Sequence, residues 1–254
     1  MILTVTPNPA WDVTYSVDQL VPGASHRVRT VTAQAGGKGL NVSRLLCDRG
    51  VATLVVAPVG GPFAALMAED LSASGIAHDF VAVAAPTRMT VAVVAAGPDR
   101  RGATLFNEPG RTIRSAEWAQ VLDRVDTRLD EATVLVCSGS LPAGIDPRVS
   151  GYLVETATRH GRAAVVDTSG PGLCHAAEAG AAVVKPTAEE LRDATGADDP
   201  MTGARQLRAG GAGAVVVSLG ADGMIALSDD GAWWARPPFT VIGNATGAGD
   251  AATA

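Results

Sequence analysis

The chain has 254 residues, a formal net charge of −6 at pH 7, and a hydrophobic content of 47% with only 4% aromatic residues. This length allows one α/β domain whose core is built mainly from Val, Leu and Ala. The acidic charge without a long basic run argues against a nucleic-acid partner, and no apolar stretch is long enough to span a bilayer, which argues against a membrane protein.

The N-terminal strand-like run, Met1–Thr6, is apolar and reads as a buried strand. Other early segments alternate in polarity, as strands with one wet face do: Asp12–Val17, Arg27–Thr32, Met89–Ala95 and Gly102–Phe106. The last two read as a hairpin around Gly97–Arg100. We expect these strands to form a small separate sheet, a lid, from residues at approximately 12–35 and 87–107.

Apolar strands and amphipathic helices fill the rest of the chain. The expected helices are Leu40–Arg49, Phe63–Ser74, Ser115–Leu129, Pro147–His160, Ala188–Thr195 and Thr202–Ala209, with Ser115 as an N-cap. The expected strands are Leu54–Val59, Thr133–Cys137, Ala163–Asp167, Ala181–Val184, Ala214–Ser218, a hairpin of Met224–Ser228 with Ala232–Arg236, and a last strand near Phe239–Ile242. Buried strands alternating with helices predict a doubly wound, mostly parallel sheet flanked by helices, in a single domain over residues 1–254.

The three cysteines, Cys47, Cys137 and Cys174, are too widely spaced for a disulfide framework or a zinc site. The chain also starts directly on a strand-like run, without the charged and apolar regions of a signal peptide. We therefore expect a reduced, cytoplasmic compartment.

The stretch Asn244–Asp250 (NATGAGD) combines a glycine-rich turn with an acid. Backbone N–H groups at Gly247, Ala248 and Gly249 can converge on an anion, and a helix starting here would add its positive end. Asp250 would then stand where a base is useful, so the motif suits phosphoryl transfer to a hydroxyl. The alternative is a structural turn capped by an aspartate. Because the chain stops four residues later, we expect too short a helix to be stable.

A second glycine turn, Gly36–Asn41 (GGKGLN), enters a helix. It matches neither a Walker A loop nor a dinucleotide fingerprint. A Gly-Gly backbone with Lys38 and Asn41 as donors suits a polyol or a phosphorylated sugar, and Asp12, just after the first strand, could accept hydrogen bonds from sugar hydroxyls. The alternatives are a structural turn with a surface lysine, and a turn aspartate.

Further polar groups follow the expected strands: Ser138–Ser140, Asp167, Lys185–Glu190 and Ser218–Gly223. Ligands of open α/β sheets bind beyond the carboxyl ends of the strands, so these groups together predict a site at one edge of the sheet. Individually, Ser140 or Thr187 could be a helix cap, and Glu190 could belong to a solvated first turn.

Taken in order, these motifs resemble those of the ribokinase/PfkB family of sugar kinases, over residues 1–254. The likeness is greatest to its hexose-phosphate branch, the 1-phosphofructokinases and tagatose-6-phosphate kinases. The resemblance implies a ribokinase-like fold with a β-sheet lid, a sugar-phosphate substrate, and ATP and Mg²⁺ as cofactors. It also implies ATP-dependent phosphorylation of a hexose phosphate.

The resemblance also assigns roles. It makes Asp250 the catalytic base and the amides of Gly247, Ala248 and Gly249 the anion hole. The implied substrate-binding residues are Asp12, Gly37, Lys38, Asn41, Arg88, Ser140 and Arg27, with the two arginines on the phosphate that the substrate already carries. The implied nucleotide-binding residues are Lys185, Thr187, Ser218, Gly220 and Gly223, and the implied magnesium ligands are Glu190 and Asp167.

The sequence departs from the family pattern in two places. Thr187 stands where the family usually has Asn, which predicts an altered metal environment. The family continues for several helices after the final motif, so we expect the chain to be C-terminally incomplete and to bind ATP weakly. The alternatives to a hexose-phosphate kinase are a kinase for an unphosphorylated sugar or nucleoside, and an impaired fragment that only binds ligand. The wet lid strands could pair with a second lid in a homodimer.

Overall fold

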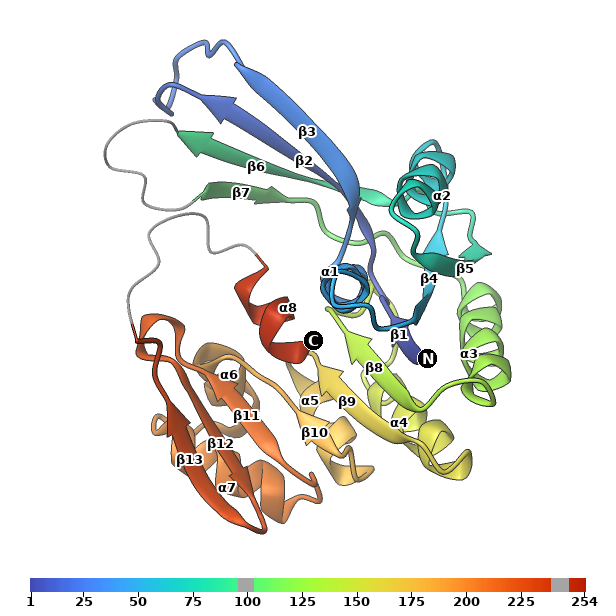
Figure 1. The fold of residues 1–254 in the computed structure, drawn as a ribbon, viewed down its shortest axis with the longest axis vertical. Helices are drawn as coiled ribbons and strands as arrows, with labels where there is room; N and C mark the ends of the chain where they lie inside the picture. The colour runs from blue at the N-terminus through green and yellow to red at the C-terminus, as the bar shows by residue number, and fades with distance from the viewer. Residues whose placement is uncertain (96–102, 239–246) are drawn as a thin grey trace.

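The computed structural model describes residues 1–95, 103–238 and 247–254. Within them, nine strands form one large sheet in the order β13-β12-β11-β10-β9-β8-β1-β4-β5 (Figure 1). These strands are β1 (Ile2–Val5), β4 (Thr53–Val59), β5 (Ala77–Ala82), β8 (Val134–Ser138), β9 (Ala163–Asp167), β10 (Val183–Val184), β11 (Val215–Ser218), β12 (Met224–Ser228) and β13 (Gly231–Ala235). All neighbours from β5 to β11 pair in parallel, whereas β12 pairs antiparallel with both β11 and β13. The predicted doubly wound, mostly parallel sheet is confirmed.

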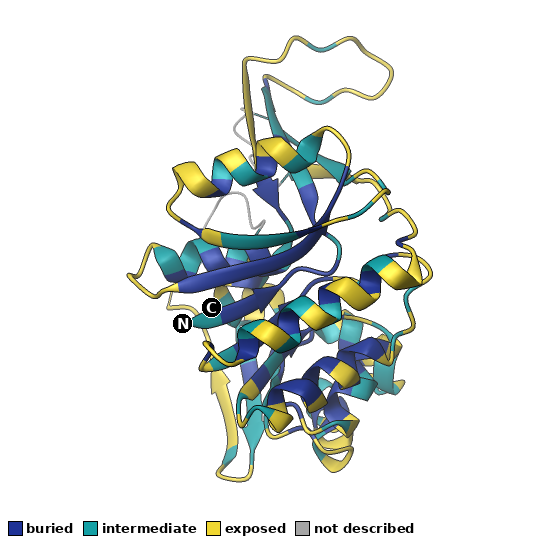
Figure 2. Ribbon diagram, turned by 90° about the vertical axis from the view of Figure 1, so that its right-hand side faces the viewer, coloured by how far each residue is buried: buried dark blue, intermediate teal, exposed yellow. Residues whose placement is uncertain are grey.

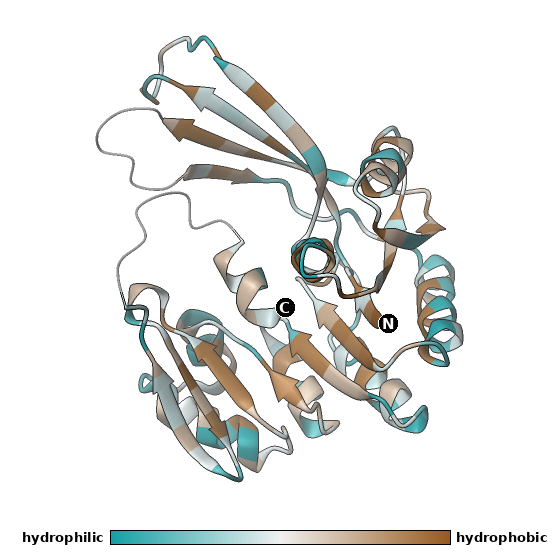
Figure 3. Cartoon of the chain, viewed as in Figure 1, coloured by the Kyte–Doolittle hydropathy of each residue, from teal (hydrophilic) through white to brown (hydrophobic). Residues whose placement is uncertain are grey.

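Helices cover both faces of this sheet and bury its apolar strands (Figure 2). The described helices are α1 (Lys38–Cys47), α2 (Phe63–Ala73), α3 (Ser115–Leu129), α4 (Val149–Arg159), α5 (Pro171–Glu178), α6 (Ala188–Thr195), α7 (Pro200–Ala209), α8 (Ala248–Thr253) and the short 3₁₀ helix η1 (Gly220–Asp222). Side chains alternate between faces along each strand, so Leu3 packs in the core with α3 and α4, while Val55 packs with α1 and α2. The apolar strands of the large sheet show as brown segments in Figure 3. Among the helices in the described part of the chain, none is long and apolar enough to cross a membrane.

A second sheet of four strands, here called the small sheet, lies beside the large one in the described residues. Its order is β3 (Thr30–Gly36), β2 (Ala10–Val17), β6 (Arg88–Ala95) and β7 (Ala103–Asn107). The sequence predicted such a separate sheet, but the strand expected at Arg27–Thr32 begins only at Thr30 and continues to Gly36. Its extent follows its partner, because β3 pairs with β2 from Thr30–Ser16 to Gly36–Ala10.

Several elements differ from the sequence-based expectation. Strand β5 and helix α5 were not predicted, because the first is a mixed-polarity edge strand and the second has only eight residues. Ser115 is the first residue of α3 rather than its N-cap, and Glu117 accepts the N–H of Arg114 instead (3.0 Å). The expected turn at residues 97–100 and the expected strand near residues 239–242 lie outside the described residues.

Helix α8 forms although the sequence predicted that it would be too short. It packs against α1, and its Thr253 hydroxyl donates to Asp167 Oδ2 at 3.0 Å. These contacts with the rest of the fold replace the length that an isolated helix would need.

Gly39 in the first turn of α1 allows this helix to lie directly on β1. A Cβ at this position would come within 2.5 Å of Thr6 Oγ1 and 2.7 Å of the Val5 carbonyl oxygen. Because the second contact is with backbone, we predict that Gly39→Ala lowers the free energy of unfolding by about 1–3 kcal/mol. Gly210→Ala, just after α7, is the control, since Gly210 has helical backbone angles and a Cβ there would meet nothing closer than 3.3 Å. Chemical denaturation measures both, and equal effects would contradict this account of the α1 contact.

Candidate active site

Polar side chains meet at the carboxyl ends of the parallel strands. Ser138 pairs with Asp167 across β8 and β9, and the Lys185 N–H donates to the Val166 carbonyl, which extends the β9–β10 pairing by one residue. This parallel register brings Asp167 and Lys185 side by side on the face that α1 and α8 cover. Their side chains form an ion pair, with Lys185 Nζ 3.1 Å from Asp167 Oδ2.

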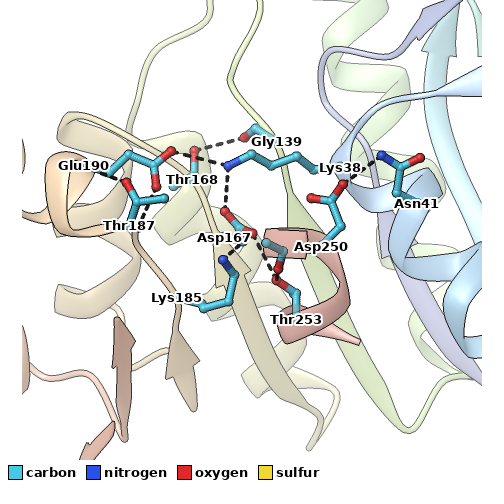
Figure 4. Close-up of polar contacts among 11 residues, drawn as sticks. Lys38, Asn41, Gly139, Asp167, Thr168, Lys185, Thr187, Glu190, Asp250 and Thr253 are labelled. Carbon is cyan, nitrogen blue, oxygen red and sulfur yellow. Dashed lines mark hydrogen bonds and ion pairs between the residues drawn. The ribbon is translucent and has the colours of Figure 1, made fainter. Parts of the chain in front are cut away.

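The ion pair belongs to a larger charged cluster (Figure 4). Lys38, the first residue of α1, places its ammonium 2.9 Å from Asp167 Oδ1 and 3.3 Å from Glu190 Oε1. The side chains of Asp167 and Lys185 are only 1% and 3% exposed, so their charges are compensated inside the protein. Burial alone would lower the pKa of Lys38, but the carboxylates of Asp167 and Glu190 outweigh it and raise that pKa, which keeps the ammonium charged.

Glu190 is oriented by the start of its own helix. The Thr187 hydroxyl accepts the Glu190 N–H at 3.1 Å, and Glu190 Oε2 accepts the Thr187 N–H at 2.9 Å. This reciprocal capping box makes Thr187 the N-cap of α6. The cap interpretation of Thr187 is therefore correct as structure, and it leaves Glu190 Oε1 facing Lys38.

Asp250 lies on α8, facing α1. Asp250 is 6% exposed, and its carboxylate accepts a hydrogen bond of 2.7 Å from Asn41 Nδ2. Burial raises the pKa of Asp250 and the negative charge of Asp167 adds to this, while the Asn41 amide and the cluster lysines act in the opposite direction. Gly247, with φ 84°, is the N-cap of α8, and the next two residues, Ala248 and Gly249, open the helix. The first N–H groups of a helix have no partner within it.

A cavity of about 590 Å³ separates the small sheet from α1, with Asp250 in its lining. One row of polar side chains crosses all four strands and faces this cavity, since Asp12 pairs with Gln34 on one side and with Thr90 on the other, and Thr90 pairs with Asn107. Burial raises the pKa of Asp12, against the hydrogen bond from Thr90 and the charge of Arg88. Gln34, Thr90 and Asn107 were missed by the sequence analysis, because strand alternation predicts a face but not which residues stand opposite each other.

Arg88 lies at the end of this cavity and is held by backbone oxygens. Its guanidinium donates to the carbonyl oxygen of Asn8, at 3.4 Å from Nε and 3.3 Å from Nη2, and to that of Glu108 at 3.0 Å. These hydrogen-bond partners are neutral, and the carboxylates of Asp12 and Glu108 favour the charged form of Arg88, which lines the cavity where an anion can reach it.

Two of the predicted substrate-binding residues lie outside the cavity lining. Ser140 is exposed and accepts a hydrogen bond of 3.3 Å from Asn8 Nδ2, and it caps no helix. Arg27 is exposed in the segment before β3 and does not line the cavity. Gly37, Lys38 and Asn41 do line it, as the sequence predicted.

The predicted nucleotide loop follows β11 and lies beside the charged cluster. Ser218 forms a parallel bridge with Thr187, and its N–H donates to the Pro186 carbonyl at 3.1 Å. Gly220 is the first residue of the short 3₁₀ helix η1 and Gly223 follows its last residue, with φ of 60° and 93°. A Cβ at Gly223 would lie 2.0 Å from the Ala235 carbonyl oxygen, so only glycine fits there.

The carboxylates of Asp167 and Glu190 are the groups with the right chemistry for Mg²⁺. Mg²⁺ is usually bound by one or two carboxylates, with water and substrate phosphates completing its coordination. Asp167 Oδ1 and Glu190 Oε1 both contact the Lys38 ammonium, so the two oxygens are close enough to share a cation. No group of three or more His, Cys, Asp or Glu side chains suited to a metal is present in the described residues. The donor set therefore fits an ion that depends on a bound phosphate for its remaining ligands.

Comparison with known proteins is consistent with this geometry. The profile of the pfkB family carbohydrate kinases matches residues 7–254. The chain is 38% identical to a 1-phosphofructokinase of Xanthomonas campestris pv. campestris, over 99% of this chain and 81% of the relative. It is 36% identical to a 1-phosphofructokinase of Rhodobacter capsulatus, over 100% of this chain and 81% of the relative.

Solved structures show the same fold. The tetrameric inhibited form of phosphofructokinase-2 from Escherichia coli superposes with a TM-score of 0.89 at 27% identity, over 98% of this chain and 84% of that one. A possible 1-phosphofructokinase from Thermotoga maritima gives a TM-score of 0.88 at 27% identity, over 98% and 81%. The chain belongs to the pfkB family of carbohydrate kinases, and it is a phosphotransferase.

Proposed function

We propose that this kinase transfers the terminal phosphoryl group of ATP to a hydroxyl of a hexose phosphate, with a fructose phosphate as the first candidate. Kinases of this family use ATP, and the two relatives compared above are named 1-phosphofructokinase. The observation that carries the proposal is the position of Asp250. It is a buried carboxylate that lines a polar cavity on one side and neighbours a cluster of lysines and acids on the other.

Asp250 acts as the general base. A hydroxyl bound in the cavity gives its proton to the Asp250 carboxylate as its oxygen attacks phosphorus, and the leaving phosphate of ADP carries away the bonding electron pair. Asn41 holds the carboxylate in place through its 2.7 Å hydrogen bond. The amides of Gly247, Ala248 and Gly249 surround the negative charge on the phosphoryl group as it moves.

The sugar phosphate occupies the cavity under the small sheet. Asp12 accepts hydrogen bonds from sugar hydroxyls, Gly37 lets the ligand approach the backbone, and Lys38 and Asn41 donate. Arg88 binds the phosphate that the substrate already carries. Ser140 borders the sugar-phosphate region. Arg27, in the segment before β3, would reach a sugar-phosphate cavity only in an assembly, where that segment extends to the cavity of another subunit.

The nucleotide lies beyond the charged cluster, along the loop after β11. Lys185 and Thr187 contact its phosphates, and Ser218, Gly220 and Gly223 form the wall of its pocket. Glu190 and Asp167 would hold Mg²⁺, which would neutralise charge on the phosphates. The Thr187 cap orients Glu190 for this role, even where the family usually has Asn.

The small sheet acts as the lid, and we propose that two lids pair in a homodimer. The face that points away from the cavity is apolar, and it exposes Val31 and Phe106 to 59% and 56%. Apolar side chains at this exposure on a sheet face favour a protein partner. The free state of all three cysteines supports a reduced compartment, the cytoplasm.

We predict that Asp250→Asn lowers kcat by about 10²–10⁴-fold, because an amide cannot take the hydroxyl proton. The variant keeps the shape of the side chain, so titration calorimetry should show sugar-phosphate binding within a few-fold of wild type. The assay measures ADP formed from ATP and Mg²⁺ with fructose 1-phosphate, with fructose 6-phosphate and fructose as comparisons. Turnover of the variant close to that of wild type would refute Asp250 as the base.

The raised pKa of Asp250 predicts where kcat falls on the acid side of its pH profile. The base works only when ionised, so kcat should fall as the pH drops through a value above the ordinary aspartate pKa of about 3.9. Asn41→Leu removes the hydrogen bond that favours the ionised form, and this fall should therefore move to higher pH. A fall that stays in place in this variant would mean that another group controls it.

Arg88 allows the phosphorylated substrate to be distinguished from an unphosphorylated sugar. A charge-assisted hydrogen bond contributes roughly 1.5–3 kcal/mol, so Arg88→Ala should raise KM for the sugar phosphate by about one to two decades. KM for the matching free sugar should change little. Arg49→Ala, at an exposed arginine outside the cavity, is the control. Equal effects of Arg88→Ala on both substrates would favour a kinase for an unphosphorylated acceptor.

A further inference from the structure

The carboxylates of Asp167 and Glu190 share one feature that their assigned role does not explain. Each has one oxygen fixed by the protein and one oxygen in contact with Lys38. Asp167 Oδ2 accepts from Lys185 at 3.1 Å and from Thr253 at 3.0 Å, and Glu190 Oε2 accepts the Thr187 N–H. The remaining oxygens, Asp167 Oδ1 and Glu190 Oε1, meet at the ammonium of Lys38 (Figure 4).

We propose that the Lys38 ammonium is the resident cation of this carboxylate pair in the nucleotide-free enzyme, and that it must leave before a divalent metal ion can bind there. The proposal rests on the proposed role of Asp167 and Glu190 as the metal-binding pair. It adds a competition within the chain to that role, and it makes Lys38 a positioning residue for the pair.

Steric and charge arguments support the competition. An ammonium at hydrogen-bond distance from both oxygens fills the space between them, so a second cation cannot occupy it at the same time. Lys38 and Lys185 balance the charges of Asp167 and Glu190, so these four side chains carry no net charge without a metal, and the nearby Asp250 carboxylate adds one negative charge. Adding a divalent ion while Lys38 stays would place excess positive charge on two carboxylates.

The side chain of Lys38 is able to leave, in contrast to that of Lys185. Lys38 is 37% exposed, whereas Lys185 is 3% exposed. Lys38 also lines the 590 Å³ cavity, so the released ammonium stays between the carboxylate pair and the sugar. Its long aliphatic chain rotates at the start of α1 without moving the helix. Metal binding would therefore deliver a positive charge to the reacting groups.

The test measures Mn²⁺ binding to the nucleotide-free, sugar-free protein by the electron paramagnetic resonance signal of free Mn²⁺. Lys38→Met removes the competing charge at similar volume, and we expect it to bind Mn²⁺ at least about ten-fold more tightly than wild type. Arg49→Met removes the same charge from the exposed residue after α1, and it should bind as wild type does. Lys38→Met/Glu190→Gln should lose the gain, because one oxygen of the pair is then neutral.

Affinity of Lys38→Met equal to or weaker than wild type would overturn the proposal, as would a gain that survives Glu190→Gln. Lys38→Gln, which keeps a hydrogen-bond donor, replaces Lys38→Met if that variant does not fold. Thermal unfolding gives a second readout, since added Mn²⁺ should raise the Tm of Lys38→Met more than that of wild type. The Mn²⁺ binding test contains no substrate, so a negative result there does not contradict the proposed kinase function, which the turnover assay tests. Conversely, a wild-type protein without turnover would not contradict the competition between Lys38 and the metal ion.

Discussion

The ion pair between Lys185 and Asp167 is the contact on which the rest of the site depends. Both side chains are almost fully buried, and a buried charge is strongly destabilising unless it is paired and hydrogen-bonded. Asp167 meets this requirement with partners from three elements, Lys185 after β10, Lys38 on α1 and Thr253 on α8. The carboxylate of Asp167 therefore joins the strand ends to α1 and α8, the two helices that carry Asn41 and Asp250.

Helix α8 shows how these contacts position Asp250, the proposed catalytic base. The helix has six residues, and its stability comes from its neighbours rather than from its length. Thr253 attaches one end to Asp167, and Asp250 accepts the Asn41 amide in the middle. The same burial that holds Asp250 in place raises the pKa of its carboxyl, which is the direction that the proposed role as a general base requires.

The small sheet supplies the second wall of the site, and its strand register decides what the substrate meets. Asp12 stands between Gln34 and Thr90 because β2 pairs with both β3 and β6. A shift of one residue would turn this polar row to the opposite face. Lys38 lines the cavity that this row faces, and its ammonium contacts Asp167 and Glu190 in the charged cluster.

The sequence by itself determined the strongly periodic elements and the residue types at the strand ends. Ala163–Asp167 and Ala188–Thr195 are the observed bounds of β9 and α6, because alternating or helical polarity is written in consecutive residues. The order of the motifs was enough to indicate the family, and three residues that it assigned to the site, Asp250, Asn41 and Gly37, line one cavity in the structure. The short β5 and α5, which lack a clear period, were missed.

Only the tertiary structure decided which of these groups touch. The sequence assigned Lys38 to the sugar, but its ammonium contacts Asp167 and Glu190, which are 129 and 152 residues away along the chain. It could not name Thr90 or Asn107, since their place opposite Asp12 depends on pairing between separate strands. The sequence predicted no stable helix after Gly247, because helix propensity depends on neighbouring residues and does not include the tertiary contacts that α1 and Asp167 make with α8. Periodicity is a property of neighbouring residues, whereas register and packing arise between segments that meet only in the folded chain.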